Sequence, residues 1–154
     1  MKLAEALTER ADIQNRLQQL QKRCAAVVRI QEGDVPDEDP AALLQEFAAL
    51  SGRLVRLVVM INRVNSTTAF DENLSIADAI ALRDQAAREQ KFFNHLADEA
   101  AARTDRYSRS EIKFVAAYPV ADLRSRADQA AKRFRELDTA LQQKNWTTDC
   151  PAFD

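Results

Sequence analysis

The chain has 154 residues, of which 46% are hydrophobic and 30% charged, so it can bury a core and has an ordinary globular composition. Its formal net charge of -2 gives no overall positive field that would recruit nucleic acid or an acidic membrane. No run approaches the roughly 18 apolar residues of a membrane-spanning helix, and the N-terminus lacks an apolar signal segment. We therefore expect one domain over residues 1–154, located in the cytoplasm.

Two helices are expected over residues 2–30 and 40–64, in a chain with only two glycines and four prolines. In both, apolar residues alternate steps of three and four, as in a heptad seam. Asp39 is the expected N-cap of the second helix, with Pro40 in its first turn. Additional apolar residues widen the stripe of this helix and predict burial on more than one side: Leu44, Val55, Val58 and Val59. Gly52 costs about 1 kcal/mol relative to Ala, which a close helix–helix crossing would explain.

Two further helices are expected over residues 75–102 and 121–144. Ser75 is the expected N-cap of the third helix, with Asp78 completing a weak capping box. The third helix carries an alanine-rich face, and the fourth has a regular heptad from Leu123 to Leu141. Four long amphipathic helices predict an all-α fold, arranged as an antiparallel bundle or coiled coil.

Small β elements are expected in the connections, a hairpin near 67–74 and a strand over 111–118. Ile112, Phe114 and Tyr118 alternate with Lys113 and Val115, which is typical of a strand. In a straight bundle the two elements lie at opposite ends, so we expect them to pair between antiparallel subunits of a homo-oligomer. An interrupted or bent third helix is the alternative.

The candidate site is the polar segment before this strand. Arginine forks in this segment suit phosphate or carboxylate, and an aromatic ring there could stack on a nucleobase. A structural network that connects helix ends and a protein-docking surface are the other interpretations. The candidate binding residues are Arg106, Tyr107, Ser108, Arg109, Ser110, Glu111 and Lys113, joined by Asn145, Trp146 and Thr147.

The sequence gives little support for a metal, a cofactor or a catalytic centre. His95 is the only histidine, and with Asp98 and Glu99 it makes a thin ligand set. No Walker A loop, glycine-rich dinucleotide loop or nucleophile elbow occurs. The two cysteines, Cys24 and Cys150, match no metal or redox spacing, and free thiols are expected.

Several segments resemble the bacterial septicolysin-like family: MKLAEAL-ERAD at the N-terminus, INR-N-T at 61–67, RYSRSEIK at 106–113 and NWTT at 145–148. The resemblance spans essentially the whole chain and implies a soluble bacterial helical protein without an assigned activity. The family name implies a cytolysin.

These observations predict a non-enzymatic helical scaffold or interaction protein that self-associates as a dimer or a multiple of dimers. The first alternative is an anion- or nucleic-acid-binding protein that uses Arg106–Lys113, although the net charge makes nucleic acid an unfavoured partner. The second is an enzyme whose acid–base groups lie among Tyr107, Glu111 and Lys113.

Overall fold

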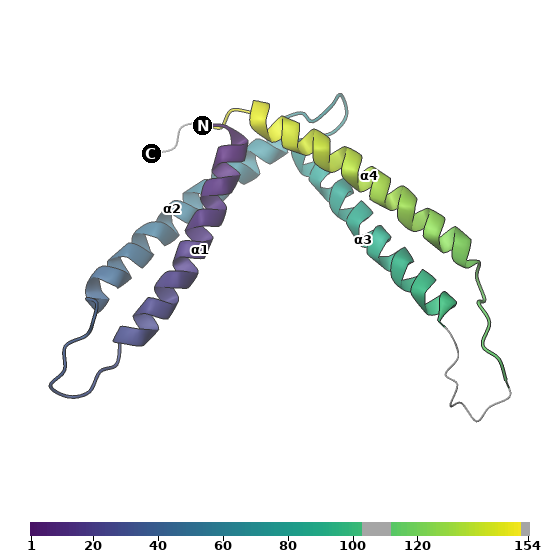
Figure 1. The fold of residues 1–154 in the computed structure, drawn as a ribbon. Helices are drawn as coiled ribbons and strands as arrows, with labels where there is room; N and C mark the ends of the chain where they lie inside the picture. The colour runs from purple at the N-terminus through teal and green to yellow at the C-terminus, as the bar shows by residue number, and fades with distance from the viewer. Residues whose placement is uncertain (103–111, 152–154) are drawn as a thin grey trace. The chain divides into compact units, whose positions relative to one another are not determined.

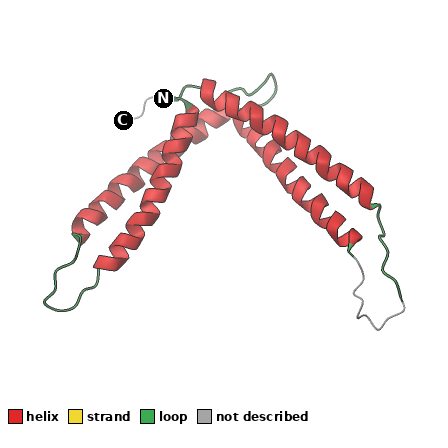
Figure 2. Ribbon diagram, in the orientation of Figure 1, coloured by secondary structure: helices red, strands yellow, loops and turns green. Residues whose placement is uncertain are grey.

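The protein is described by a computed structural model, which places residues 1–102 and 112–151. Four helices follow one another along the chain (Figures 1 and 2): α1 spans Leu3–Val27, α2 Pro40–Thr67, α3 Ile76–Ala101 and α4 Val120–Thr147. The all-α prediction is confirmed. The chain divides into two compact units, Met1–Ala69 with Gln143–Asp154 and Phe70–Gln142. The two units share α4, so the division does not decide between one domain and two. A single domain over 1–154 stays a prediction. The arrangement of the four helices as a bundle also stays a prediction.

The first unit contains a hairpin of α1 and α2, which pack along each other. Near the loop that joins the two helices, Leu20, Val27 and Leu43 form a buried cluster, against which Cys24 and Leu50 pack. Complete burial of one such leucine stabilises the fold by about 1.5–3 kcal/mol. The heptad pattern predicted most of the buried residues on the two helices: Leu3, Ala6, Ile13, Leu20, Val27, Leu43, Leu57, Ile61 and Val64.

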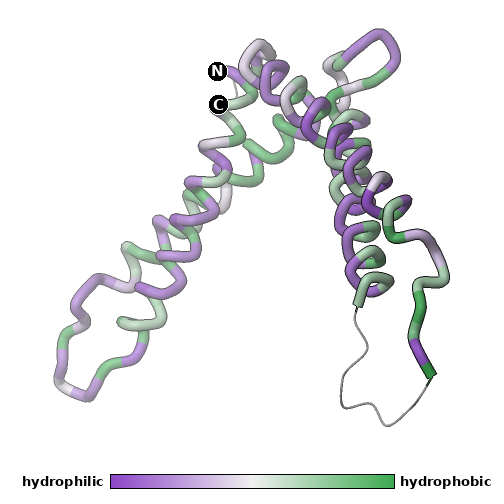
Figure 3. The backbone as a smooth tube through the Cα atoms, turned by 45° about the vertical axis from the view of Figure 1, so that its right-hand side comes forward, coloured by the Kyte–Doolittle hydropathy of each residue, from purple (hydrophilic) through white to green (hydrophobic). Residues whose placement is uncertain are grey.

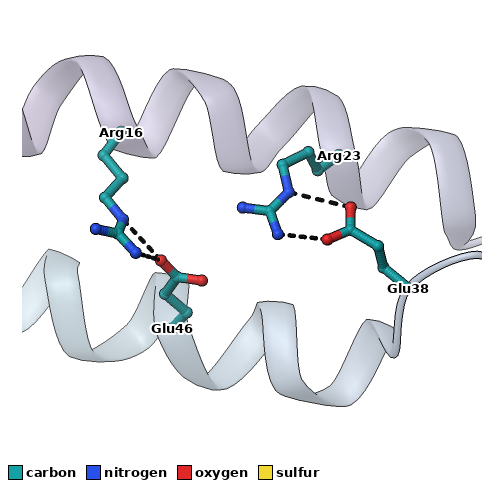
Figure 4. Close-up of polar contacts among 4 residues, drawn as sticks. All are labelled: Arg16, Arg23, Glu38 and Glu46. Atoms are coloured by element: carbon teal, nitrogen blue, oxygen red, sulfur yellow. Dashed lines mark hydrogen bonds and ion pairs between the residues drawn. The ribbon is translucent and has the colours of Figure 1, made fainter.

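Ion pairs between the two chain segments set the register of this hairpin. One pair joins Glu9 and Arg53. Figure 4 shows the other two, Arg16 with Glu46 at 2.5 Å and Arg23 with Glu38, whose Nε–Oε2 distance is 3.0 Å. The three members on α1 are seven residues apart, and their partners on the returning chain are seven and eight residues apart. All of these groups are partly exposed, so each pair contributes little to stability. Their regular spacing favours one antiparallel register over shifted ones.

The second unit contains the hairpin of α3 and α4, whose seam is built mainly from alanine. Its buried residues include Ala79, Ala86, Ala97, Ala127 and Ala130. Small side chains let two helices approach closely, as the alanine-rich face predicted. Ion pairs also join these two helices: Arg83 with Asp138 at 3.4 Å, Glu89 with Arg133, and Asp98 with Arg124 at 2.6 Å.

The helix starts follow the predicted caps. The Asp39 carboxylate accepts a hydrogen bond from the Ala41 amide at 3.0 Å. The Asp78 amide donates to Ser75 Oγ at 3.2 Å, and the Ser75 amide donates to the Asp78 carboxylate at 2.9 Å. These bonds satisfy amide donors that have no partner inside the helix, so the sequence signals fixed both starts.

The helix ends differ from the expected ranges. α1 stops at Val27 rather than near residue 30, whereas α2 and α4 continue to Thr67 and Thr147. The hydroxyl of Thr67 donates to the Arg63 carbonyl at 2.9 Å, and that of Thr147 donates to the Gln143 carbonyl at 3.1 Å. Both threonine hydroxyls are thus satisfied within the helix, which continues past the residues where a polar break and a tail were expected.

The predicted β elements are wrong: apart from isolated bridges, residues 1–102 and 112–151 contain no strand. After α2 the chain makes a tight turn, in which the Asp71 carboxylate accepts from the amides of Asn73 and Leu74 at 2.8 Å. Residues 112–118 form a loop that Figure 3 colours mostly hydrophobic, and Phe114 is 81% exposed. A strand needs a neighbouring strand to pair with, and the described residues form no strand that accompanies residues 112–118. Without these strands, the predicted β pairing between subunits has no structural basis. The alternative of an interrupted third helix is not observed either, because α3 is continuous from Ile76 to Ala101.

The start of α1 is joined to the segment that follows α4 within the first unit. The Leu3 amide donates to the Thr148 carbonyl at 2.9 Å, and the Cys150 amide donates to the Met1 carbonyl at 2.8 Å. An isolated antiparallel bridge joins Lys2 and Asp149, whose side chains form an ion pair at 2.8 Å. The hydrogen bond from Lys2 lowers the pKa of the Asp149 carboxyl.

Candidate functional sites

Most of the predicted binding segment lies outside the described residues, namely Arg106, Tyr107, Ser108, Arg109, Ser110 and Glu111. Lys113 lies in the exposed loop before α4. The other predicted residues, Asn145, Trp146 and Thr147, form the last turn of α4, where Trp146 is 60% exposed. Lys113 belongs to the second unit and this turn to the first, and each unit is described by itself. The predicted network between them stays a prediction.

The described residues hold no group of three or more histidine, cysteine or acidic side chains that could bind a metal ion. His95 lies exposed on α3. Both cysteines are free, with Cys24 half-buried and Cys150 buried. Burial raises the pKa of the Cys150 thiol, which disfavours the reactive thiolate. None of the helices in residues 1–102 and 112–151 combines the length and the apolar character of a membrane span.

The outer face of α2 is an exposed apolar surface. Leu44 is 59% exposed, Val55 63% and Val59 52%, and all three lie away from the α1 contact. Spacings of four, three, four and four residues place Leu44, Ala48, Ser51, Val55 and Val59 on one helical face. We call these five residues the α2 outer face. The widened stripe seen in the sequence predicted burial on more than one side, but the intrachain partner covers only one.

Gly52 borders the α2 outer face, and its side of the helix is open. A Cβ atom at this position would meet, among the described residues, only the guanidinium of Arg56, at an ordinary distance of 3.7 Å. No described helix therefore crosses α2 closely at Gly52. Glycine in a helix interior is destabilising relative to alanine. The intrachain packing gives no reason for its presence.

A groove of about 650 Å³ runs along the α3·α4 hairpin. The Phe92 and Phe93 rings meet edge to face with centroids 5.4 Å apart, and Phe92 is 58% exposed. The Arg126 guanidinium lies 5.7 Å from the centroid of the Phe93 ring and donates to the Tyr118 hydroxyl at 3.2 Å. We call this the Arg–Phe groove, lined by Arg88, Glu89, Phe92, Phe93, Arg126, Gln129 and Arg133.

The groove is positively charged. It contains three arginines and one glutamate, so its formal charge is +3 − 1 = +2 in a chain whose net charge is -2. Arg133 is paired with Glu89, whereas Arg88 and Arg126 form no ion pair with any residue in the described ranges. Arginine presents planar sets of N–H donors that match the oxygens of phosphate and carboxylate groups. The groove therefore offers anion recognition beside an exposed aromatic ring.

Residues 10–150 of the chain match DUF6847, a family of unknown function. The chain belongs to this family. The match includes residues 61–67, 106–113 and 145–148, on which the resemblance to the septicolysin-like family rested. That resemblance is wrong, and the cytolysin activity that it implied falls with it. Short polar motifs at helix ends were too little to identify a family, because capping and turn chemistry selects similar residues in unrelated proteins.

The DUF6847 chain is also similar to a functionally unknown conserved protein from Corynebacterium diphtheriae, known from a crystal structure. The two sequences are 43% identical over 98% of this chain and 99% of the other, with a TM-score of 0.93. A search of the curated proteins found no match. The comparisons therefore support the helical fold and assign no activity.

The sequence analysis of the DUF6847 chain missed the Arg–Phe groove. Arg126 and Arg133 are seven residues apart and thus share a helical face, which is a visible signal. Their proximity to Phe92 and Arg88 depends on the register between α3 and α4, which hydrophobic spacing alone did not determine. The interhelical ion pairs of Glu89 and Asp98 fix that register, and the charge pattern of the two helices is the signal that encodes it.

Proposed function

We propose that this DUF6847 protein is a non-enzymatic helical interaction protein that self-associates through the α2 outer face. The observation that carries the proposal is the exposed apolar face of α2, which the hairpin with α1 leaves uncovered. An exposed row of large apolar side chains on a helix marks an interaction surface more often than a solvated one. A reducing, cytoplasmic location is part of the proposal and agrees with the free Cys24 and Cys150.

The spacing of the α2 outer face fits a second copy of the same helix. A two-fold axis between Ser51 and Gly52 would place Leu44 opposite Val59 and Ala48 opposite Val55 in an antiparallel pair. Each pair would then join a larger side chain to a smaller one, and Ser51 and Gly52 would allow close approach at the centre. Such self-complementarity is what an isologous dimer interface requires. It also gives Gly52 a physical role.

The charged borders of the face are compatible with the same pairing. Phe47 is 45% exposed and borders the face on the side away from Gly52 and Arg56, where it would add apolar contact with the second copy. Arg63 is exposed and would lie beside the first turn of the second α2, next to the Asp39 carboxylate. Like charges would not face each other across the axis, so electrostatics does not oppose the dimer.

Sedimentation equilibrium at micromolar concentrations tests the proposal, with Gly52→Leu as the decisive variant. The native chain should sediment with twice its mass of 17.4 kDa. Gly52→Leu should give a monomer, because a bulky side chain would block close approach at the axis. Its helicity should be retained, since the added side chain meets open space and leucine is the better helix former. Ala49→Leu, at an exposed α2 position off the face, is the matched control and should stay dimeric.

A monomeric native chain at these concentrations would refute self-association. A dimer that Gly52→Leu leaves intact would place the interface elsewhere. The anion-binding alternative through Arg106–Lys113 receives no support from described contacts, because only Ile112 and Lys113 of that segment are described. Likewise, the enzyme alternative rests on Tyr107, Glu111 and Lys113, of which only Lys113 is a described residue.

A further inference from the structure

We infer that the Arg–Phe groove of the α3·α4 hairpin binds a small aromatic phosphate ester, of which a nucleoside phosphate is the simplest representative. This site is separate from the α2 outer face and does not depend on self-association. It also uses none of the residues in the segment Arg106–Lys113. The inference rests on three properties of the groove: an exposed aromatic ring, two guanidinium groups without carboxylate partners in the described chain, and a volume suited to a small ligand.

The aromatic half of the ligand would stack on Phe92. The Arg126 guanidinium already lies over the Phe93 ring at 5.7 Å, so Phe93 is engaged within the protein. Phe92 is 58% exposed and meets Phe93 edge to face at an interplanar angle of 73°. The edge contact holds the Phe92 ring in place and leaves ring surface accessible. Stacking on an exposed aromatic side chain suits any nucleobase, because every base has a π-face.

The phosphate half would be bound by arginine. Arg88 lies one helical turn before Phe92 on α3, so the two side chains share a face. From α4, Arg133 faces the same groove, and Glu89 orients its guanidinium through their ion pair. Arg126 is held by the Tyr118 hydroxyl at 3.2 Å, which keeps a second set of donors at the other end of the groove. Phosphate oxygens accept such charge-assisted bonds in pairs.

The size and shape of the groove favour a small molecule over a free anion or a polymer. Its volume of about 650 Å³ falls within the usual range for small-ligand sites, roughly 300–1,000 Å³. Inorganic phosphate would use the arginines but would leave the Phe92 ring exposed. A nucleic acid would need a positive surface beyond the groove, and the net charge of -2 does not provide it.

Isothermal titration calorimetry of the full chain with ATP, AMP, adenosine and inorganic triphosphate tests the inference. ATP should bind, and adenosine and triphosphate should each bind at least about tenfold more weakly, since each lacks one half of the recognition. Phe92→Ala and Arg88→Gln should each weaken ATP binding by about tenfold or more. Phe92→Trp should bind ATP about as tightly as the native chain, because the larger tryptophan ring still stacks on the base. Arg135→Gln, an exposed α4 arginine outside the groove, is the control and should bind like the native chain.

The outcomes separate the parts of the inference. Absence of ATP and AMP binding at millimolar ligand would overturn it, as would native-like binding by both groove variants with unchanged far-UV circular dichroism. Equal binding of triphosphate and ATP would remove the aromatic role of Phe92. Much tighter binding of a single-stranded oligonucleotide than of ATP would replace the small-ligand site with a nucleic-acid surface. Gly52→Leu should bind ATP as the native chain does, so failure of the dimer and failure of this site are distinguishable.

Discussion

Leu43 and Leu44 are adjacent leucines on α2 with opposite environments, and truncating each to alanine tests the packing directly. Leu43 is 4% exposed and belongs to the cluster with Leu20 and Val27. Leu44 is 59% exposed on the α2 outer face. The two variants have the same chemistry and almost the same helix propensity change, so any difference between them reports the environment.

The expected magnitudes follow from burial. Leu43→Ala removes three buried carbon groups at about 0.8 kcal/mol each, so the transfer loss is about 2.4 kcal/mol before any cavity contribution. The free energy of unfolding should therefore fall by about 2–4 kcal/mol, a large part of the 5–15 kcal/mol typical of a domain. Leu44→Ala should change the stability of the monomer by less than about 0.5 kcal/mol. At higher protein concentration, Leu44→Ala should become less stable than the native chain, because its weakened dimer stabilises the folded state less.

Urea denaturation followed by far-UV circular dichroism, repeated over a range of protein concentrations, measures both effects. The Leu43→Ala midpoint should be lowered at every concentration. The Leu44→Ala midpoint should match the native one in dilute protein and fall behind it only as the protein is concentrated. Equal losses for both variants in dilute protein would refute the reasoning, because they would show that the α2 outer face is buried within one chain.

Three other predictions address the caps, the chain ends and the thiols. Ser75→Ala should lower the free energy of unfolding by about 1 kcal/mol in urea denaturation, because the Asp78 amide loses its cap; an unchanged midpoint would contradict the observed capping box. The hydrogen bond from Lys2 lowers the pKa of the Asp149 carboxyl in the folded chain. The contribution of this pair to the free energy of unfolding should therefore be complete above the unfolded pKa of about 3.9 and be lost as the pH falls through the lower folded pKa. NMR titration of the Asp149 carboxyl should show this shift, and Lys2→Met should remove it. In the folded chain iodoacetamide should alkylate the half-buried Cys24 faster than Cys150, whose pKa burial raises, and both should react after unfolding without reduction; mass spectrometry that finds neither alkylated would show a disulfide.

The sequence by itself determined the helices and their starts. Apolar steps of three and four residues specify which face of a helix is buried, and Asp39 and Ser75 specify where α2 and α3 begin, because these signals act within one or two helical turns. The sequence did not determine the ends of α2 and α4, since Thr67 and Thr147 are helical although they were expected in a break and a tail. The alternating pattern over 111–118 predicted a strand wrongly, since a strand depends on a partner that local spacing does not supply.

The tertiary structure decided which helices pair and what their surfaces present. Only the register of α3 against α4 brings Phe92 to the groove that Arg126 and Arg133 line. Only the pairing of α1 with one side of α2 shows that Leu44 is exposed while its neighbour Leu43 is buried. Both outcomes depend on contacts between residues far apart in the chain, where packing and ion pairs choose among arrangements that the same local pattern allows equally.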